Sequence, residues 1–529
     1  MKTIFVIFDS LNRTALAPYG GDATLTPNFA RFADRAVTFD KHYVGSLPCM
    51  PARRDMHTGR LNMMHRPWGP LEPFDNSYAQ MLSTAGVYTH MVTDHYHYFE
   101  PGGAGYAQAF DSWSFKRGQE YDPVTVRVAP DVAALREGYD PRHYPLDRLP
   151  EGTLTHRSTD PLAYRRMQHA LNAEHMTDEA DYPLAQCFAS AFEFLDGNKD
   201  ADDWLLQLEC FDPHEPFMAA DRFRDGDDSR PVLDWPPYER LANSPEEIDS
   251  IRGNYRALLR MCDDYFGQLL DWMDATGAWQ DTCLIVTTDH GYLLGEHEWW
   301  GKNKMPCYEE IAHIPLMVWH PDHADQAGTR RGGVTQTMDI MPTLLELNGV
   351  PVPGEVQARS LLPHLANPDA PAEDRTVVFG LFGGPMGVTD GSYSYVHYPT
   401  STATDALNMY TMAPQHMTES FSPEELGQAG MVPPLGFTKG ARLMRVPVAR
   451  EVKEAGFAAA ADSAAGSAVY DLRVDPGQTT PIEAPGTTAR LQRALAETFA
   501  RHEAPPELFH YYGLDDVLSE TAAPKRSAG

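Results

Sequence analysis

Short apolar segments that end at an aspartate or a histidine are the feature that most restricts what this chain can fold into. Four occur, at Lys2–Phe8, Val87–Val92, Trp204–Phe211 and Cys283–Thr288. Continuous apolar, β-branched runs of this length are typical of strands that are buried on both faces of a parallel sheet. A fifth short run and three helical patterns complete the series, at Leu316–Trp319, Pro27–Ala36, Ile251–Ala275 and Asp339–Leu347. Strands that alternate with helices predict an α/β fold with a mainly parallel sheet.

The polar residues that follow these strands predict where a functional site lies. They are Asp9, Asp94, His214, Asp289 and His290. Parallel strands end at the same edge of a sheet, and ligands of open α/β sheets bind at that edge. One such residue alone is usually a turn or a cap, but five at one edge predict a site.

The chain is long enough for more than one structural unit, since single cores seldom grow beyond about 250–300 residues. Its 529 residues contain later, shorter strand patterns at Val377–Gly380, Gly391–Tyr398 and Val469–Leu472, and a helical pattern at Leu491–Ala500. We therefore expect a catalytic α/β domain over 1–374 and a smaller C-terminal α+β subdomain with a polar tail over 375–529. Tyr121–Pro161 is expected to be a long loop, and the polar stretch from His510 is a candidate assembly arm of a homo-oligomer.

Charge and apolar patterning narrow the classes of partner. The formal net charge is −31, which opposes binding to nucleic acid or to an anionic membrane. A small anionic substrate would need cations placed locally. No signal-peptide pattern or membrane-spanning stretch is visible, and the six cysteines lack CxxC spacing, so a cytoplasmic protein with reduced thiols is expected.

The decisive motif is C-x-P-x-R, formed by Cys49, Pro51 and Arg53 and followed by Thr58-Gly59-Arg60. With this extension it resembles the signature of the sulfatase branch of the alkaline phosphatase superfamily. Four further motifs match that family in order: Asp212-Pro213-His214, Asp289-His290-Gly291 with Lys302, Asp339-x-x-Pro342-Thr343-Leu344, and Tyr470-Asp471-Leu472 with Asp475-Pro476.

The resemblance implies a fold, a modified residue and a metal. The fold would be a large mixed, mainly parallel sheet sandwiched by helices. A formylglycine-generating enzyme would oxidise Cys49 to formylglycine, whose hydrate attacks the ester and forms a covalent sulfo-enzyme intermediate. One divalent metal ion (Ca, Mn or Mg) would be held by Asp9, Asp289, His290 and the oxygen of residue 49.

The resemblance also assigns catalytic roles. Arg53 would position the hydroxyls of residue 49, and His214 and Lys302 would protonate the leaving oxygen or hold the non-bridging oxygens. The substrate would be a small anionic ester.

The chain departs from the family pattern at two places. Ser10 stands where sulfatases carry a second aspartate, and Thr93-Asp94-His95-Tyr96-His97 stands where they carry K-x-H. Asp94, His95, Tyr96 and His97 are therefore unranked candidates for lining the substrate. Phosphonate monoester hydrolases of the same superfamily share both departures.

Three hypotheses follow: an arylsulfatase-like sulfuric ester hydrolase, a phosphonate monoester or phosphodiester hydrolase with the same machinery, and a non-enzymatic binding protein of the same fold. Trp299 and Trp300 are either an aryl-binding wall or ordinary core residues.

Overall fold

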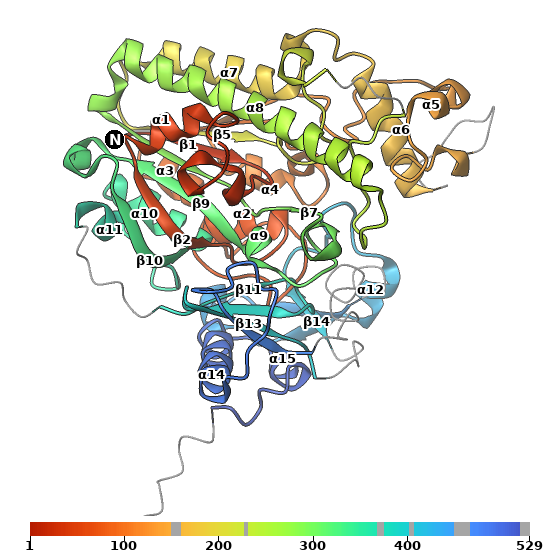
Figure 1. The fold of residues 1–529 in the computed structure, drawn as a ribbon. Helices are drawn as coiled ribbons and strands as arrows, with labels where there is room; N and C mark the ends of the chain where they lie inside the picture. Colours follow the sequence, from red (N-terminus) through yellow and green to blue (C-terminus); the bar gives the residue numbers. More distant parts are fainter. Residues whose placement is uncertain (150–159, 227–230, 368–374, 401–406, 449–465, 519–529) are drawn as a thin grey trace, which may run out of the picture.

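The centre of the molecule is an eight-stranded sheet. The computed structural model describes residues 1–149, 160–226, 231–367, 375–400, 407–448 and 466–518. The strand order is β10-β2-β9-β6-β1-β5-β3-β4 (Figure 1). The strands are β1 (Lys2–Phe8), β2 (Val37–Tyr43), β3 (Tyr88–Thr93), β4 (Ser112–Phe115), β5 (Trp204–Cys210), β6 (Thr282–Thr287), β9 (His313–Trp319) and β10 (Arg330–Gln336). Only β9 runs antiparallel to its neighbours within this sheet, which confirms the predicted mixed, mainly parallel sheet.

Helices cover both faces of the sheet. Successive residues of β1 point to opposite faces, so its side chains pack into two different core clusters. Ile4, Val6 and Phe8 pack into one core cluster with helices α1 (Pro27–Ala33), α7 (Pro183–Asn198) and α8 (Pro245–Thr276). Phe5 and Ile7 pack into a second cluster with α2 (Cys49–Thr58), α3 (Tyr78–Thr84) and α10 (Ile340–Leu347). The sheet is thus sandwiched by helices, as the resemblance implied.

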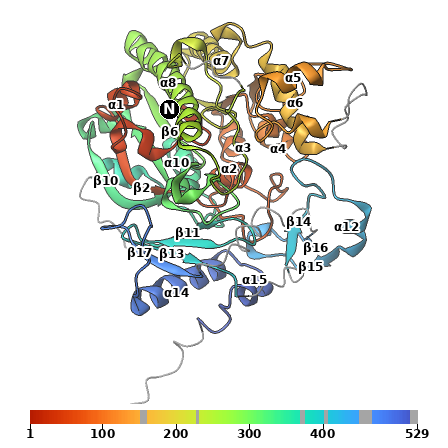
Figure 2. The same ribbon diagram turned by 45° about the vertical axis from the view of Figure 1, so that its right-hand side comes forward.

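Smaller antiparallel sheets form the C-terminal region (Figure 2). One has the order β11-β12-β13-β17 and packs against α14 (Pro485–Arg501). Its strands are β11 (Val377–Gly380), β12 (Met386–Thr389), β13 (Tyr393–His397) and β17 (Ala468–Asp471). The second has the order β14-β16-β15, made of β14 (Asn408–Thr411), β16 (Leu443–Pro447) and β15 (Gly430–Val432). The backbone of Gly380 hydrogen-bonds with Leu47 and Gly45, so β11 joins this region to the segment before α2. The division at residue 374 stays a prediction.

The remaining regular elements are short. They are α4 (Ala104–Ala107), α5 (Val132–Gly138), α6 (Pro161–Ala173), β7 (Leu293–Leu294), β8 (Trp300–Gly301), α9 (Glu309–Ala312), α11 (Leu362–Ala366), α12 (Pro423–Gln428) and α15 (Pro506–Tyr511). No helix in the described part of the chain is both long and apolar enough to cross a lipid bilayer.

One sequence prediction is wrong. The expected long loop over Tyr121–Pro161 contains α5, which begins after the cap Asp131 and buries Val132 and Leu135 against α6. Two apolar residues at helical spacing after a cap are enough to form this helix, although Pro, Asp and Arg dominate the segment. Residues 150–159 lie outside the described part.

The stretch from His510 packs on its own chain as far as residue 518, and its role as an assembly arm stays a prediction. Tyr511, Tyr512 and Leu514 are buried against α14, and the hydroxyl of Tyr511 donates to the carbonyl of Gly383 at 2.9 Å. The burial of its aromatic residues, rather than the exposure of its polar residues, therefore determines where this segment lies. The expected frayed tail at Thr521–Gly529 lies outside the described residues.

Candidate active site

Cys49 is the first residue of α2, and local contacts fix its position. The loop before it is tied to the helix by Asp55, which accepts hydrogen bonds from the backbone N–H of Ser46 at 2.5 Å and from its hydroxyl at 3.0 Å. A Cβ on Gly45 would lie 2.3 Å from Asp55 Oδ2, so only glycine fits there. Gly59 ends the helix in the left-handed conformation at φ 65°. The C-x-P-x-R…T-G-R motif thus contains the residues that present and end this helix.

Four of the predicted residues converge at the carboxyl edge of the sheet. Asp9 follows β1, Asp289 and His290 follow the adjacent β6, and Cys49 faces them from α2. Each offers one ligand atom, and these atoms all lie within 4.8 Å of one another, with every residue buried. Cys49 Sγ is 3.3 Å from His290 Nε2.

The tautomer of His290 suits metal binding. Its Nδ1 lies 3.0 Å from the backbone carbonyl of Gly291, which can only accept, so Nδ1 carries the proton. Nε2 then presents its lone pair to the cluster. A Cβ on Gly291 would lie 1.9 Å from the carbonyl oxygen of Glu310, which explains the glycine of the D-H-G motif.

Arg53 is buried among three carboxylates. Its Nη2 lies 2.9 Å from Asp9 Oδ2, its Nε lies 2.6 Å from Glu209 Oε1, and its Nη1 binds Asp289. Burial alone would raise the pKa of Asp9, but Arg53, His214 and Lys302 hold it well below its ordinary value. Asp9 is therefore ionised despite being inaccessible to solvent.

Lys302 reaches the same cluster through Ser10. Its Nζ donates to Ser10 Oγ at 3.0 Å, and Ser10 Oγ donates to Asp9 Oδ1 at 2.8 Å. The Nζ also lies 3.9 Å from Asp9 Oδ1 and 3.8 Å from Glu215 Oε2. Burial lowers the pKa of Lys302, but Cys49, Glu215 and the other acidic groups outweigh it and raise the pKa, so the ammonium is charged. Ser10, noted in the sequence only as a missing aspartate, links the lysine to Asp9.

Buried carboxyl groups outnumber buried cations in this cluster, counted over the described residues. Four buried carboxyl groups (Asp9, Glu209, Glu215 and Asp289) lie within 4 Å of the two buried cations Arg53 and Lys302. Buried charges are stable only when they are paired. The donor set of two carboxylates, one imidazole and residue 49 therefore fits an added divalent cation.

His214 lies at this edge after β5. Its Nδ1 donates to the backbone carbonyl of Glu215, and burial, with Lys302 nearby, lowers the pKa of the ring well below its ordinary value. The imidazole is therefore neutral, and Nε2 is its unprotonated nitrogen.

The four unranked candidates after β3 occupy different environments. His95 Nε2 lies 3.4 Å from Asp9 Oδ2, and neither ring nitrogen has a hydrogen-bond partner in the described structure. Asp94 accepts from the backbone N–H of Phe211 at 2.7 Å and from Gln119 at 3.3 Å. Burial raises the pKa of Asp94 to about 7. Of the four, His95 is the one in contact with the metal-ligand cluster.

Tyr96 and His97 lie further out and are partly exposed. The Tyr96 ring meets the Tyr121 ring edge-on at 5.6 Å. His97 Nδ1 lies 2.5 Å from Glu100 Oε2.

Sequence analysis missed Glu209 and Glu215. Glu209 follows Gln207 by two residues within the buried strand β5, so both point to the face that α2 covers, and Gln207 Nε2 donates to Glu209 Oε2 at 2.9 Å. Two polar residues on one face of an otherwise apolar strand are a signal that could have been used. Glu215 carried no such signal.

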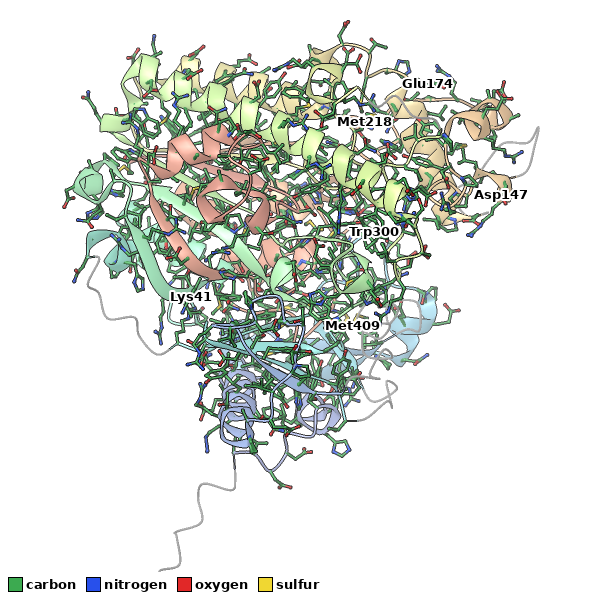
Figure 3. All side chains as sticks on the ribbon, in the orientation of Figure 1. Lys41, Asp147, Glu174, Met218, Trp300 and Met409 are labelled. Atoms are coloured by element: carbon green, nitrogen blue, oxygen red, sulfur yellow. The ribbon has the colours of Figure 1, made fainter. Side chains whose placement is uncertain are left out.

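Trp299 and Trp300 are core residues rather than an aryl-binding wall. Trp300 is buried and donates from Nε1 to Asn243 Oδ1 at 2.9 Å, and Figure 3 shows it inside the molecule. Trp299 is buried, and the guanidinium of Arg240 lies 4.5 Å from its ring centroid.

Comparison with known protein families identifies the family to which this chain belongs. The sulfatase family pattern matches residues 2–350. The chain belongs to the sulfatase family. The C-terminal pattern of N-sulphoglucosamine sulphohydrolase matches residues 295–422. The motif-based resemblance is thereby confirmed, and the chain is a sulfatase-type hydrolase.

Individual relatives agree with this assignment. N-acetylglucosamine-6-O-sulfatase of Bacteroides thetaiotaomicron is 25% identical over 448 residues, 75% of this chain and 74% of that protein. A solved structure in complex with its substrate D-glucosamine-2-N,6-O-disulfate superimposes with a TM-score of 0.60 at 18% identity, covering 96% of this chain and 98% of the other. Phosphonate monoester hydrolase of Agrobacterium radiobacter superimposes with a TM-score of 0.58 at 18% identity, covering 95% and 96%. At these identities the two superpositions establish the fold alone.

Proposed function

We propose that this sulfatase hydrolyses sulfuric esters with one divalent metal ion and a formylglycine made from Cys49. The observation that carries the proposal is the convergence of Asp9, Cys49, Asp289 and His290, whose ligand atoms lie within 4.8 Å of one another. Arg53 and Lys302 bring two cations to the same point.

A divalent metal fits the residues present. It would be held by Asp9, Asp289, His290 and residue 49, and would balance the excess of buried carboxylates. When bound, such an ion supplies Lewis acidity and lowers the pKa of a coordinated hydroxyl. Hard oxygen donors suit Ca or Mg, and the imidazole favours Mn.

Conversion of Cys49 to formylglycine also fits the site. Burial, followed by the charge of Asp9, raises the pKa of the Cys49 thiol well above its ordinary value. A protonated thiol is a poor nucleophile and a poor ligand for hard cations. A hydrated aldehyde at this position supplies an oxygen ligand, an attacking hydroxyl and a second hydroxyl for product release.

The remaining residues have roles that follow from their protonation. Lys302 is charged, so it can hold a sulfuryl oxygen and provide a proton to the leaving oxygen. His214 is neutral with Nε2 unprotonated, so it accepts a hydrogen bond or a proton at this site. Arg53 is fixed by Asp9, Glu209 and Asp289, and this fixed geometry lets it orient residue 49 without reorganisation.

Phosphonate monoester or phosphodiester hydrolysis is the second candidate. Ser10 favours it, because it stands where sulfatases carry a second aspartate and phosphonate monoester hydrolases do not. The ratio of kcat/KM for 4-nitrophenyl sulfate and 4-nitrophenyl phenylphosphonate, measured on one preparation, decides between the two candidates. A ratio above 1 supports the sulfatase proposal, and a ratio below 1 supports the alternative.

The proposed residue is tested by mass spectrometry of the tryptic peptide 42–53. We expect a mass about 18 Da below that of the cysteine peptide, or a mass near it for the hydrate, after co-expression with a formylglycine-generating enzyme. Cys49→Ala is expected to remove hydrolysis. An intact thiol in fully active protein, or hydrolysis by Cys49→Ala, contradicts the proposal.

Metal dependence is tested on the same preparation. Chelation is expected to abolish hydrolysis and lower the melting temperature, and titration with Mn, Ca or Mg should restore both. Full activity of protein shown by elemental analysis to contain less than one metal ion per ten chains contradicts it.

A further inference from the structure

Arg166 is a buried cation with no carboxylate counter-ion among the residues that the structure describes. It lies on α6 and is one of the buried residues of that helix. Only 7% of the residue is exposed, and its Nη1 has no hydrogen-bond partner within the described structure. Its guanidinium carbon lies 3.5 Å from the Trp235 ring centroid. A cation–π contact compensates only part of the hydration that a buried charge loses.

One acidic group near Arg166, Glu215, also belongs to the candidate active site. Burial lowers the pKa of Arg166, and the nearby Tyr144, Glu215 and Glu120 act in the opposite direction. Glu215 is the carboxylate that lies 3.8 Å from Lys302. Backbone contacts link the two places: Arg166 lies over Trp235, and the carbonyl of the preceding Asp234 accepts a hydrogen bond at 2.7 Å from the N–H of Phe217, two residues after Glu215.

Two further buried polar atoms near Lys302 also lack hydrogen-bond partners in the described structure. Glu215 Oε2 and Tyr292 Oη are buried without a hydrogen bond to any described residue. Tyr292 interacts electrostatically with both Glu215 and Arg166, and its ring centroid lies 5.9 Å from Lys302 Nζ. Buried polar groups in folded proteins are nearly always satisfied, so the free hydrogen-bonding capacity of Arg166 Nη1 and Tyr292 Oη is available to a polar ligand or to water.

Glu215 does not serve as the counter-ion of Arg166. Its Oε1 accepts the hydroxyl of Tyr238, and its other oxygen faces Lys302. No carboxylate of the described residues lies within 4 Å of the Arg166 guanidinium. The planar guanidinium presents parallel N–H groups that match a carboxylate or a sulfate.

We infer that Arg166 binds a second anionic group, a carboxylate or a sulfate, on the leaving-group part of the substrate. The inference rests on the proposed function, and it makes the natural substrate a sulfate ester of an already anionic molecule. With a net charge of −31, the chain repels such a molecule unless a cation is placed to receive it. Arg166 is then a specificity-determining residue.

The test uses substrates that differ by one charge. These are 4-sulfooxybenzoate and its methyl ester, with 4-sulfooxybenzenesulfonate as the arm that separates a sulfate-like anion from a carboxylate. The wild-type protein is expected to prefer a charged substrate over the ester by at least tenfold in kcat/KM. Arg166→Met, which keeps a stem over Trp235, should lose about 10- to 100-fold with the charged substrate and less than threefold with the ester.

The matched control is Arg165→Met, one residue away on the same helix and exposed, with its guanidinium 4.5 Å from the Tyr121 ring centroid. It should leave the ratio of the two substrates unchanged. If Arg165→Met loses the preference for the charged substrate equally, the effect comes from the overall electrostatic field of the protein rather than from Arg166. That result overturns the inference. A wild-type preference below threefold, or an unchanged ratio in Arg166→Met, also overturns it.

The outcomes separate the inference from the proposed function. Hydrolysis of the ester with no preference for the charged arms refutes the Arg166 subsite alone, whereas hydrolysis of none of the sulfate esters refutes the proposed function. If Arg166→Met does not fold, Arg166→Lys, which keeps the charge but not the paired N–H groups, should lose part of the preference. The preference of the wild type remains a test in either case.

Discussion

Arg53→Lys tests whether one guanidinium holds the site together. Arg53 uses three nitrogens for three buried carboxylates, Asp9, Glu209 and Asp289. A lysine has a single nitrogen, so it leaves at least one and as many as two of them buried without a counter-ion. Removing one partner of a buried pair costs about 3–5 kcal/mol. An unfolding entropy of about 2.1 cal/mol/K per residue gives ~1.1 kcal/mol/K for a chain this long, so the melting temperature should fall by about 3–5 °C.

The assay is scanning calorimetry at one scan rate, in chelator, because a bound metal would offset part of the unpaired charge. The matched control is Arg54→Lys on the same helix, where Arg54 pairs with Asp75 through Nε at 2.7 Å and Nη2 at 3.1 Å. A lysine can keep one of these contacts, so the expected loss is roughly 1 kcal/mol, or about 1 °C. If Arg53→Lys melts within 1 °C of the wild type and keeps its kcat/KM, Arg53 does not organise the site as argued.

Two further variants test the geometry around the cluster. Gly291→Ala places a Cβ 1.9 Å from the Glu310 carbonyl oxygen and should weaken Mn binding at least tenfold in a calorimetric titration. The control Gly332→Ala, whose Cβ would have no atom within 4 Å, should leave Mn binding unchanged. Equal affinities of the two variants would contradict the steric argument. Burial raises the pKa of Asp94 to about 7. Its contribution to stability is therefore full at low pH and lost as the pH rises through about 7. Asp94→Asn should flatten the fall in melting temperature between pH 5 and pH 8, and an equally steep fall would show that another group causes it.

Five of the six interior strands of the large sheet were predicted, whereas β2 (VTFDKHY) and both edge strands were not. β1, β3, β5, β6 and β9 are apolar runs buried between two layers of helices, and composition alone indicates such strands. β4 and β10 are the two edge strands, and β10 (RRGGVTQ) has almost no apolar signal. Edge strands are commonly polar, because apolar edges promote aggregation. Only tertiary contact identifies them.

The site was predictable where residues follow strands and not where they come from loops. Asp9, Asp289 and His290 could be placed together because β1 and β6 end at one edge. The residues between Asp94 and His97 could not be ranked, because a one-residue change of register in a loop turns a side chain from the site toward the backbone of Phe211. Arg166 could not be found at all. It lies on α6, which packs with α5 in a core cluster separate from those of the sheet, and its neighbours in the sequence form no motif that points to the site.

The two departures from the family pattern compensate each other electrostatically. Ser10 removes a negative charge next to Asp9, and the residue after β3 that contacts Asp9 is His95 rather than a lysine. Burial and the charge of Arg53 lower the pKa of His95 well below its ordinary value, so His95 is neutral. One carboxylate and one ammonium are thus absent together, and the excess of negative charge that a divalent ion would balance is preserved. What changes is the distribution of charge. The cations that remain, Arg53 and Lys302, reach the cluster from α2 and from the loop after β8, so within the described residues His95, on the side toward β3, contributes no charge.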